Sequence, residues 1–280
     1  VCCDVWSCCS FDMKTVSLVG LLWIAVKKVS LRLSGRQILK DVSCVLGVGV
    51  TAVLGQNGAG KSSLLKCMAG SLEPQGGEVL LNGTPLKNVA IKELAKSRAV
   101  LSQNLDVAFP YTVLEIVLMG RSPFSVQANS DYDRGQALNA LEHMRVDHLK
   151  DRQYSSLSGG EKQRVQIARI LTQIGFDDES LSGRYVFMDE PTSALDVQHQ
   201  AYLRDVVRDL ARKGASILCV LHDVNYAWDI ANSIIFMKDG GVMAYHDTAN
   251  VLDLDVLQDV YQKRPTQTQD AEDGRRYYWF

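Results

Sequence analysis

The segment from Gly55 to Ser62 has the residue types and spacing needed to hold phosphate groups. It fits the pattern G-x-x-x-x-G-K-[ST] and lies between an apolar run, Val50–Leu54, and a helical pattern that ends at Gly70. Glycines let backbone N–H groups turn inward around phosphate oxygens, and the N-terminus of the following helix adds partial positive charge. We expect Lys61 to reach the terminal phosphates and the Ser62 hydroxyl to hold Mg²⁺. The predicted nucleotide-binding residues of this segment are Gly55, Gln56, Asn57, Gly58, Ala59, Gly60, Lys61, Ser62 and Ser63.

Two adjacent carboxylates, Asp189 and Glu190, follow a continuously apolar run at residues 185–188. Such a run is typical of a strand buried on both faces, and ligands of open α/β sheets bind at the carboxyl ends of strands. Asp189 is therefore a candidate to hold Mg²⁺, directly or through water. Glu190 is a candidate to orient and polarise an attacking water, a role worth roughly 10²–10⁴-fold in rate. Adjacent acids at a strand end are also common in solvated turns, and the presence of Lys61 in the same chain favours the catalytic interpretation.

A second helix start with unusual residues lies at Ser158–Glu161. Ser158 and Glu161 fit the S-x-x-E pattern of a capping box, which by itself predicts only a well-capped helix. Gly159 and Gly160 are poor first-turn residues, each about 1 kcal/mol less favourable than alanine in a helix. They make sense where a phosphate group has to approach the backbone closely, so Ser158, Gly159 and Gly160 are candidate binding residues. The chain would then carry two helix starts that face phosphate.

The elements that would position these residues alternate between short apolar runs and helical patterns, which is the signature of an α/β domain. Thr112 and Glu115 form another capping box, at the start of a predicted helix that ends at Gly120. Residues 104–156 are mostly helical in pattern, and residues 263–280 form a polar tail with an aromatic end that is either packed or loose. Further strands are expected at 76–83 with an Asn82-Gly83 turn, at 99–101 and 217–221, and in a hairpin of 234–237 with 242–245.

Composition argues against several classes of function. The 280 residues are 46% hydrophobic and 22% charged, and a net charge of −2 without a long basic run gives no support for nucleic-acid binding. The longest apolar stretch, Val16–Val26, is shorter than the about 20 residues of a membrane-spanning helix. It resembles a weak signal peptide, and a buried strand is the favoured alternative.

The chain has seven cysteines, four of them within the first nine residues, and this odd, scattered count indicates a reducing compartment. Met13 is a candidate natural start, which would make residues 1–12 an extension.

Taken together, these motifs resemble those of the ATP-binding subunits of ABC transporters. The resemblance covers roughly residues 25–260, and six motifs occur in the order expected of that family. The motifs are Walker A at Gly55–Ser62, the Q-loop at Gln103, the signature at Leu157–Glu161, Walker B at Val186–Glu190, the D-loop at Ser193–Asp196 and the switch histidine at His222.

The resemblance implies a P-loop NTPase (ABC ATPase) core of α/β class, with an N-terminal antiparallel β subdomain and an inserted α-helical subdomain. It also implies that ATP and Mg²⁺ are bound, that Glu190, His222 and Gln103 are catalytic, and that Ser62, Gln103 and Asp189 contact the metal. In this family two cassettes pack head to tail, with each ATP between the Walker A of one chain and the signature of the other, so a homodimer is expected. The implied limits are 1–24 for an N-terminal extension, 25–262 for the ATPase domain, 104–165 for its helical subdomain and 263–280 for the tail.

One feature departs from the family pattern. The family often stacks adenine on an aromatic residue upstream of Walker A, and by spacing that position falls near Leu33, where no aromatic residue occurs. We therefore assign no adenine contact. The remaining histidines are expected to be structural; they are His143, His148, His199 and His246.

Some features favour one kind of transporter. Phe109–Glu115 and Arg121–Pro123 resemble segments of the importers of iron chelates, haem and cobalamin, in which this surface receives a helix of the membrane permease. About ten additional residues near 174–183, and the sequence Asp196–Gln200, resemble the hemin-import ATP-binding family. The resemblance implies a peripheral subunit on the cytoplasmic face of the bacterial inner membrane, docked on a permease dimer and linked indirectly to a periplasmic substrate-binding protein. Ferric-siderophore import, cobalamin import, a non-transport ABC ATPase and a nucleotide-sensing module without turnover are the alternatives.

Overall fold

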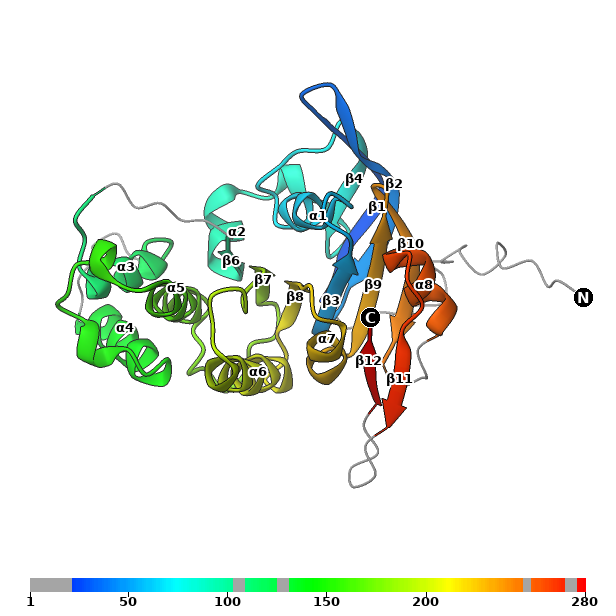
Figure 1. Cartoon of the computed structure of the whole chain (residues 1–280). Coiled ribbons are helices and arrows are strands. Elements are labelled where there is room, and N and C mark those ends of the chain that lie inside the picture. Colours follow the sequence, from blue (N-terminus) through cyan, green and yellow to red (C-terminus); the bar gives the residue numbers. More distant parts are fainter. Residues whose placement is uncertain (1–21, 103–108, 125–130, 249–252, 270–275) are drawn as a thin grey trace, which may run out of the picture.

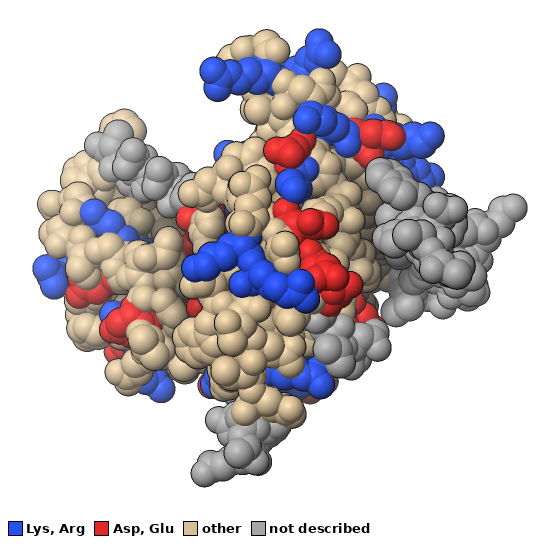
Figure 2. Space-filling model, turned by 45° about the vertical axis from the view of Figure 1, so that its right-hand side comes forward, with Lys and Arg blue, Asp and Glu red and all other residues tan. Residues whose placement is uncertain are grey.

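The computed structural model describes residues 22–102, 109–124, 131–248, 253–269 and 276–280 (Figure 1). The predicted α/β class is confirmed, because a mostly parallel six-stranded sheet, an antiparallel four-stranded sheet and a group of helices pack together. Basic and acidic side chains are interspersed on the face shown in Figure 2, in keeping with the near-zero net charge.

The six-stranded sheet carries the candidate site. Its strands are parallel except for β10 (Gly241–Asp247), which pairs antiparallel with its neighbour. The central strands are buried because apolar runs such as Tyr185–Asp189 pack on both faces of the sheet. Alternate residues divide between two cores: Val186 and Met188 face one, and Phe187 faces the other. The order is β10 (Gly241–Asp247), β9 (Ser233–Lys238), β3 (Gly49–Gly55), β8 (Ser216–Val220), β7 (Tyr185–Asp189) and β6 (Arg98–Leu101).

The four-stranded antiparallel sheet is formed by strands from the N-terminal part of the described chain, residues 24–85. The apolar stretch expected to form a strand contributes Ile24, Ala25 and Val26, all buried, which confirms the strand interpretation for these residues. Asn82 and Gly83 have φ values of 50° and 86° and form the predicted turn. The order is β2 (Arg36–Leu46), β1 (Ile24–Leu33), β4 (Gly76–Leu81) and β5 (Thr84–Pro85).

A group of helices, drawn in green in Figure 1, lies beyond the β6 edge of the large sheet. A buried ion pair, Arg121 to Asp133 at 2.9 Å, ties two of its elements together. The helix predicted at 113–119 ends at Leu118 and continues as a 3₁₀ turn. A Cβ on Gly120 would lie 2.4 Å from the carbonyl oxygen of Arg169, so close packing also requires this glycine. The group comprises α3 (Val113–Leu118), η3 (Met119–Arg121), α4 (Asp131–His143), η4 (Asp147–Leu149), η5 (Tyr154–Ser156) and α5 (Gly159–Ile174).

The remaining helices flank the sheets, and the end of the described chain forms a hairpin. Tyr278 in the second hairpin strand is only 2% exposed, so this part of the aromatic tail is packed rather than loose. In the described ranges, none of the helices has both the length and the apolar character to span a membrane. The elements are α1 (Lys61–Met68), η2 (Leu86–Asn88), α2 (Ile91–Ser97), α6 (Val197–Arg212), α7 (Val224–Ile230), α8 (Leu254–Tyr261), β11 (Thr266–Gln269) and β12 (Arg276–Trp279).

Candidate functional site

The loop between β3 and α1 has a backbone that only glycine permits at several positions. Gly55, Gly58 and Gly60 have φ values of 152°, 81° and 98°. A Cβ on Gly55 would lie 2.2 Å from the carbonyl oxygen of Met237, whereas a Cβ on Gly58 would meet nothing within 4 Å. The first glycine is thus required by packing and the second only by the turn. At the end of the loop, Gly60 caps α1 without any side-chain hydrogen bond, so the helix N-terminus is left open.

Lys61 is buried inside this loop. Its Nζ donates hydrogen bonds to the carbonyl oxygens of Gly55, at 2.8 Å, and Gln56, at 3.1 Å. Burial lowers the pKa of Lys61, and the nearby carboxylates Glu190 and Asp189 oppose that shift. The ammonium group has three donors and uses two, so it can serve an anion without leaving the loop.

Ser62 and Asp189 meet across the end of the sheet. The Ser62 hydroxyl donates to Asp189 Oδ1 at 2.9 Å, which joins the start of α1 to the end of β7. Asp189 is 2% exposed, and burial raises its pKa, while the hydrogen bond from Ser62 lowers it. A buried carboxylate beside a hydroxyl is an all-oxygen donor set of the kind that Mg²⁺ prefers. These two residues therefore fit the predicted metal site.

Glu190 and His222 form a close pair at the same edge. His222 Nε2 and Glu190 Oε1 are 2.5 Å apart, and the pair joins the end of β7 to the loop after β8. Glu190 adopts φ 51°, a left-handed conformation that is uncommon for a residue with a side chain. Its N–H donates to Val220 at 3.1 Å, and Ser193 donates to its carbonyl oxygen, so the conformation is held from both sides. This backbone turn directs the carboxylate away from the strand axis and toward His222.

The predicted capping box at the start of α5 is confirmed. Ser158 accepts from the N–H of Glu161, and the Glu161 carboxylate accepts from the N–H of Ser158 at 2.8 Å and from its hydroxyl at 2.7 Å. A Cβ on Gly160 would lie 3.1 Å from the carbonyl oxygen of Ala194, so packing restricts this position. A Cβ on Gly159 would meet only the Ala194 methyl group, at 3.9 Å. Packing therefore does not explain Gly159, and its backbone is exposed.

The structure thus brings the Walker A lysine and serine together with the two carboxylates and the histidine, at the carboxyl ends of β3, β7 and β8. Ser158–Gly160 lie apart from this group, against the loop that follows Glu190. Gln103 lies outside the described residues. The assembled residues suit the binding of a triphosphate and the activation of a water beside it.

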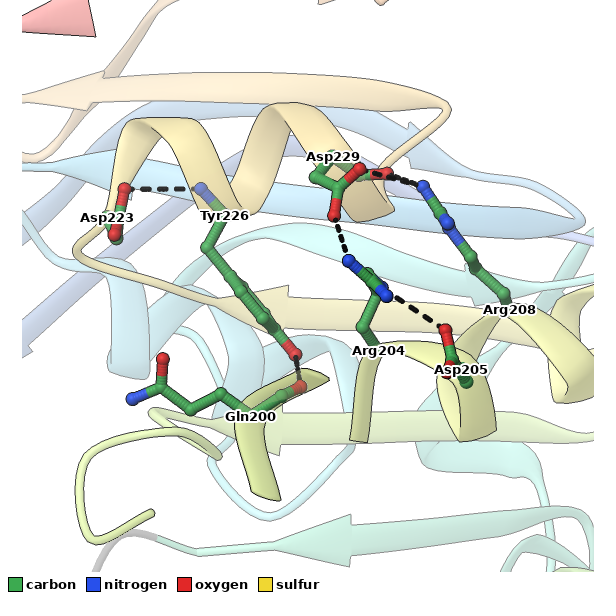
Figure 3. A network of polar contacts seen from close by, with 7 residues as sticks. All are labelled: Gln200, Arg204, Asp205, Arg208, Asp223, Tyr226 and Asp229. Atoms are coloured by element: carbon green, nitrogen blue, oxygen red, sulfur yellow. Dashed lines mark hydrogen bonds and ion pairs between the residues drawn. The ribbon is translucent and has the colours of Figure 1, made fainter. Parts of the chain in front are cut away.

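A network of polar contacts that fixes the loops around the site was not predicted from the sequence. Gln200 in α6 donates from its side chain to the carbonyl oxygens of Leu195, at 2.9 Å, and Thr192, and accepts at its main chain from the Tyr226 hydroxyl at 3.2 Å. Asp223, next to His222, caps α7 by accepting from the N–H of Tyr226. Arg204 and Arg208 of α6 both bind Asp229 of α7, so two ion pairs hold α6 and α7 together (Figure 3). Such partners are distant in sequence, which is why spacing did not find them.

Comparison with known proteins is consistent with this geometry. The family model for "ABC transporter" matches residues 39–193. The chain is 44% identical over 216 residues to the hemin import ATP-binding protein HmuV of Gloeobacter violaceus, covering 77% of this chain and 78% of that protein. It is 39% identical over 240 residues to the protein of the same name from Escherichia coli O157:H7, covering 85% and 91%.

Solved structures show the same fold. A metal-chelate type ABC transporter in an inward-facing conformation is 26% identical, with a TM-score of 0.74 over 92% of this chain and 96% of that chain. A bacterial ABC transporter cassette solved as a dimer is 24% identical, with a TM-score of 0.71 over 81% of this chain and all of the other.

Proposed function

Since this chain belongs to the ABC transporter family of ATP-binding proteins, we propose that it is the ATPase that powers hemin import through a membrane permease. The observation that carries the proposal is the convergence of Lys61, Ser62, Asp189, Glu190 and His222 on one edge of the sheet. The names of the relatives support hemin as the cargo.

The nucleotide is bound by the loop from Gly55 to Ser63. Backbone N–H groups of the loop and the open N-terminus of α1 receive the β- and γ-phosphate oxygens, because no side chain of the protein occupies that helix end. Lys61 is held at the centre of the loop by its two carbonyl contacts and adds one further N–H and a positive charge.

Ser62, Asp189 and Gln103 would hold Mg²⁺. The ion supplies charge neutralisation of the phosphates. Burial of Asp189 disfavours its ionised form, so a cation bound beside it stabilises the carboxylate. Before a cation binds, the hydrogen bond from Ser62 orients the Asp189 carboxylate.

Hydrolysis depends on Glu190 and His222. Glu190 accepts a hydrogen bond from the attacking water and increases its nucleophilicity, and His222 contacts both this carboxylate and the γ-phosphate. The 2.5 Å contact between the two side chains holds Glu190 in the orientation that its left-handed backbone sets. The water is thereby placed in line with the bond that breaks.

A second copy of the chain completes the site. Ser158, Gly159 and Gly160 bind the ATP held by the partner cassette, and the exposure of Gly159 without a packing reason supports this role. ATP closes the homodimer, and hydrolysis reopens it. Phe109, 67% exposed at the start of the helical group, docks on the permease dimer at the cytoplasmic face of the inner membrane. A periplasmic binding protein reaches the complex only through the permease.

Reconstitution tests the cargo. In vesicles that contain its permease, the chain should drive ATP-dependent uptake of hemin, and Glu190→Gln should abolish uptake while retaining ATP and accumulating as a dimer in gel filtration. Phe109→Ala should lower the hemin taken up per ATP hydrolysed. Uptake of a ferric siderophore or cobalamin in place of hemin would overturn the substrate assignment, and a purely monomeric Glu190→Gln variant with ATP would overturn the dimer.

A further inference from the structure

The hairpin β11–β12 has no role in the function proposed above, yet it packs on the helix that follows His222. Asn225, in the first turn of α7, donates to the carbonyl oxygen of Tyr278 at 3.0 Å and accepts from its N–H at 2.8 Å. The buried Tyr278 ring also meets Trp228 edge-on, with centroids 5.8 Å apart. Two hydrogen bonds between the Asn225 side chain and the Tyr278 main chain, together with an aromatic contact, therefore fix β12 to α7.

The same strand reaches a second element. The ring of Phe280 packs on Tyr261, the last residue of α8, with centroids 4.8 Å apart. The main-chain oxygen of Asp259 accepts from Lys238 at 2.7 Å, which anchors α8 to β9. The end of α8 is therefore held by β9 through Asp259 and by Phe280 through Tyr261.

Tyr261 presents a buried hydroxyl to the nucleotide site. Among the described residues its Oη has no hydrogen-bond partner of ordinary geometry. Burial raises the pKa of this hydroxyl, the charge of Asp223 raises it further, and a main-chain contact with Gly55 lowers it. The backbone agrees with a position near Gly55, because Gly55 pairs with Met237 of β9, the neighbour of the Lys238 that binds α8. Gly55 begins the phosphate loop, and Asp223 caps α7 directly after His222. An unpaired buried hydroxyl costs free energy that phenylalanine at this position would avoid, so a function is needed to account for it.

We propose that Tyr261 is a positioning residue for ATP hydrolysis. Phe280, which follows β12, packs on the Tyr261 ring and holds it between the start of the phosphate loop and the cap of α7. The hydroxyl sets the spacing of Gly55 and Asp223 and thereby the distance of His222 from the γ-phosphate. The inference rests on the proposed role of His222. It makes the hairpin β11–β12 part of the catalytic scaffold.

The sharpest test is Tyr261→Phe, because it removes one oxygen atom and keeps the ring. Since the lost group is buried and unpaired, the melting temperature should stay the same or rise. The turnover number should nevertheless fall about three- to tenfold, with KM for ATP changed by less than about twofold. A merely structural role would move stability and turnover together. Turnover within about 1.5-fold of the unaltered protein would overturn the proposal.

Two substitutions in β12 provide a matched pair. Phe280→Ala removes the ring that presses on Tyr261 and should lower turnover about twofold to fivefold, with Phe280→Tyr restoring it. Trp279→Ala removes a larger ring from the same strand and should leave turnover unchanged, because Trp279 is 58% exposed and contacts Thr268 and Tyr277 of the hairpin itself. Equal losses in the two alanine variants would indicate general loosening of the hairpin and contradict the specific contact.

His222→Ala separates this inference from the function on which it rests. If His222→Ala abolishes hydrolysis and Tyr261→Phe has no effect, the positioning role is wrong and the catalytic assignment stands. If His222→Ala hydrolyses ATP normally, the assigned role of His222 is wrong, and the inference fails with it.

Discussion

The starts of α1 and α5, the two helix ends proposed to face phosphate, are built in opposite ways. At α1, Gly60 provides no side-chain cap and the first turn carries no acidic residue. At α5, Ser158 and Glu161 satisfy each other in a complete capping box. The first end is left open for a ligand of its own chain, whereas the second is closed by its own side chains and presents a glycine backbone beside them.

The start of α3 shows which part of the α5 start is special. Thr112 and Glu115 form the same capping box with the same reciprocal bonds, but Val113 and Leu114 follow the cap and are buried in the core. The capping box is therefore common to a structural and a candidate functional helix start. The difference lies in Gly159, which packing does not explain.

The largest expected effect is at the open end. Lys61→Ala removes the buried cation at the centre of the loop, and we expect ATP affinity to fall about 100-fold or more, corresponding to about 2.7 kcal/mol. Isothermal titration calorimetry with ATP would measure it. An unchanged dissociation constant would mean that α1 is not the phosphate-binding helix start.

At the closed end the effect should appear in turnover and not in the affinity of one chain for ATP. Gly159→Ala has room for its methyl group and should be neutral or stabilising by about 0.5–1 kcal/mol, because alanine is the better helix former. Turnover should still fall about tenfold, since the methyl group blocks the backbone from the partner's phosphate. Normal turnover at saturating ATP would show that the glycine is not needed for catalysis.

The α3 start should respond in stability alone. Thr112→Ala removes a cap and should destabilise the protein by about 1 kcal/mol in urea unfolding. ATP hydrolysis by the purified chain should be unaffected, because the residues that follow this cap are buried in the core. A loss of hydrolysis in a variant that is still folded would remove the contrast between α3 and α5.

The smallest effect concerns pH. Hydrogen bonds from the side chain and main chain of Ser158 lower the pKa of Glu161 in the folded protein. A carboxyl group with a lowered folded pKa stabilises above its unfolded pKa, about 4.3, and loses that contribution as pH falls through the folded value. The melting-temperature difference between the unaltered protein and Glu161→Gln should therefore shrink between about pH 6 and about pH 3.5. A constant difference would mean that the box does not depend on charge.

Local pattern was sufficient to predict several strands, one tight turn and two helix starts. The strands at 50–54 and 185–188 are nearly continuous apolar runs. The Asn82-Gly83 turn involves adjacent residues, and each capping box joins residues three apart. The contact between Ser62 and Asp189, which are 127 positions apart, is not specified by either local pattern, because loop closure leaves no local trace in the sequence.

Long-range packing contacts could not be predicted from the sequence. The left-handed backbone at Glu190 depends on a hydrogen bond to Val220 on another strand, and nothing adjacent to Glu190 specifies it. The tail could not be placed because its contact, the hydrogen bond between Tyr278 and Asn225, joins residues 53 positions apart. Gly120 was predicted as a helix end, whereas the approach of the Arg169 main chain also demands it.

The contact of Trp228 with β12 gives the protein a built-in fluorophore beside its candidate catalytic centre. Trp228 lies in the helix that follows His222, and its ring centroid is 5.4 Å from that of His246 and 5.8 Å from that of Tyr278. Its emission spectrum should change when the hairpin leaves that helix, and the sequence contains only three other tryptophans to subtract. Rapid-mixing measurements with ATP could therefore follow this part of the molecule in real time without an attached label.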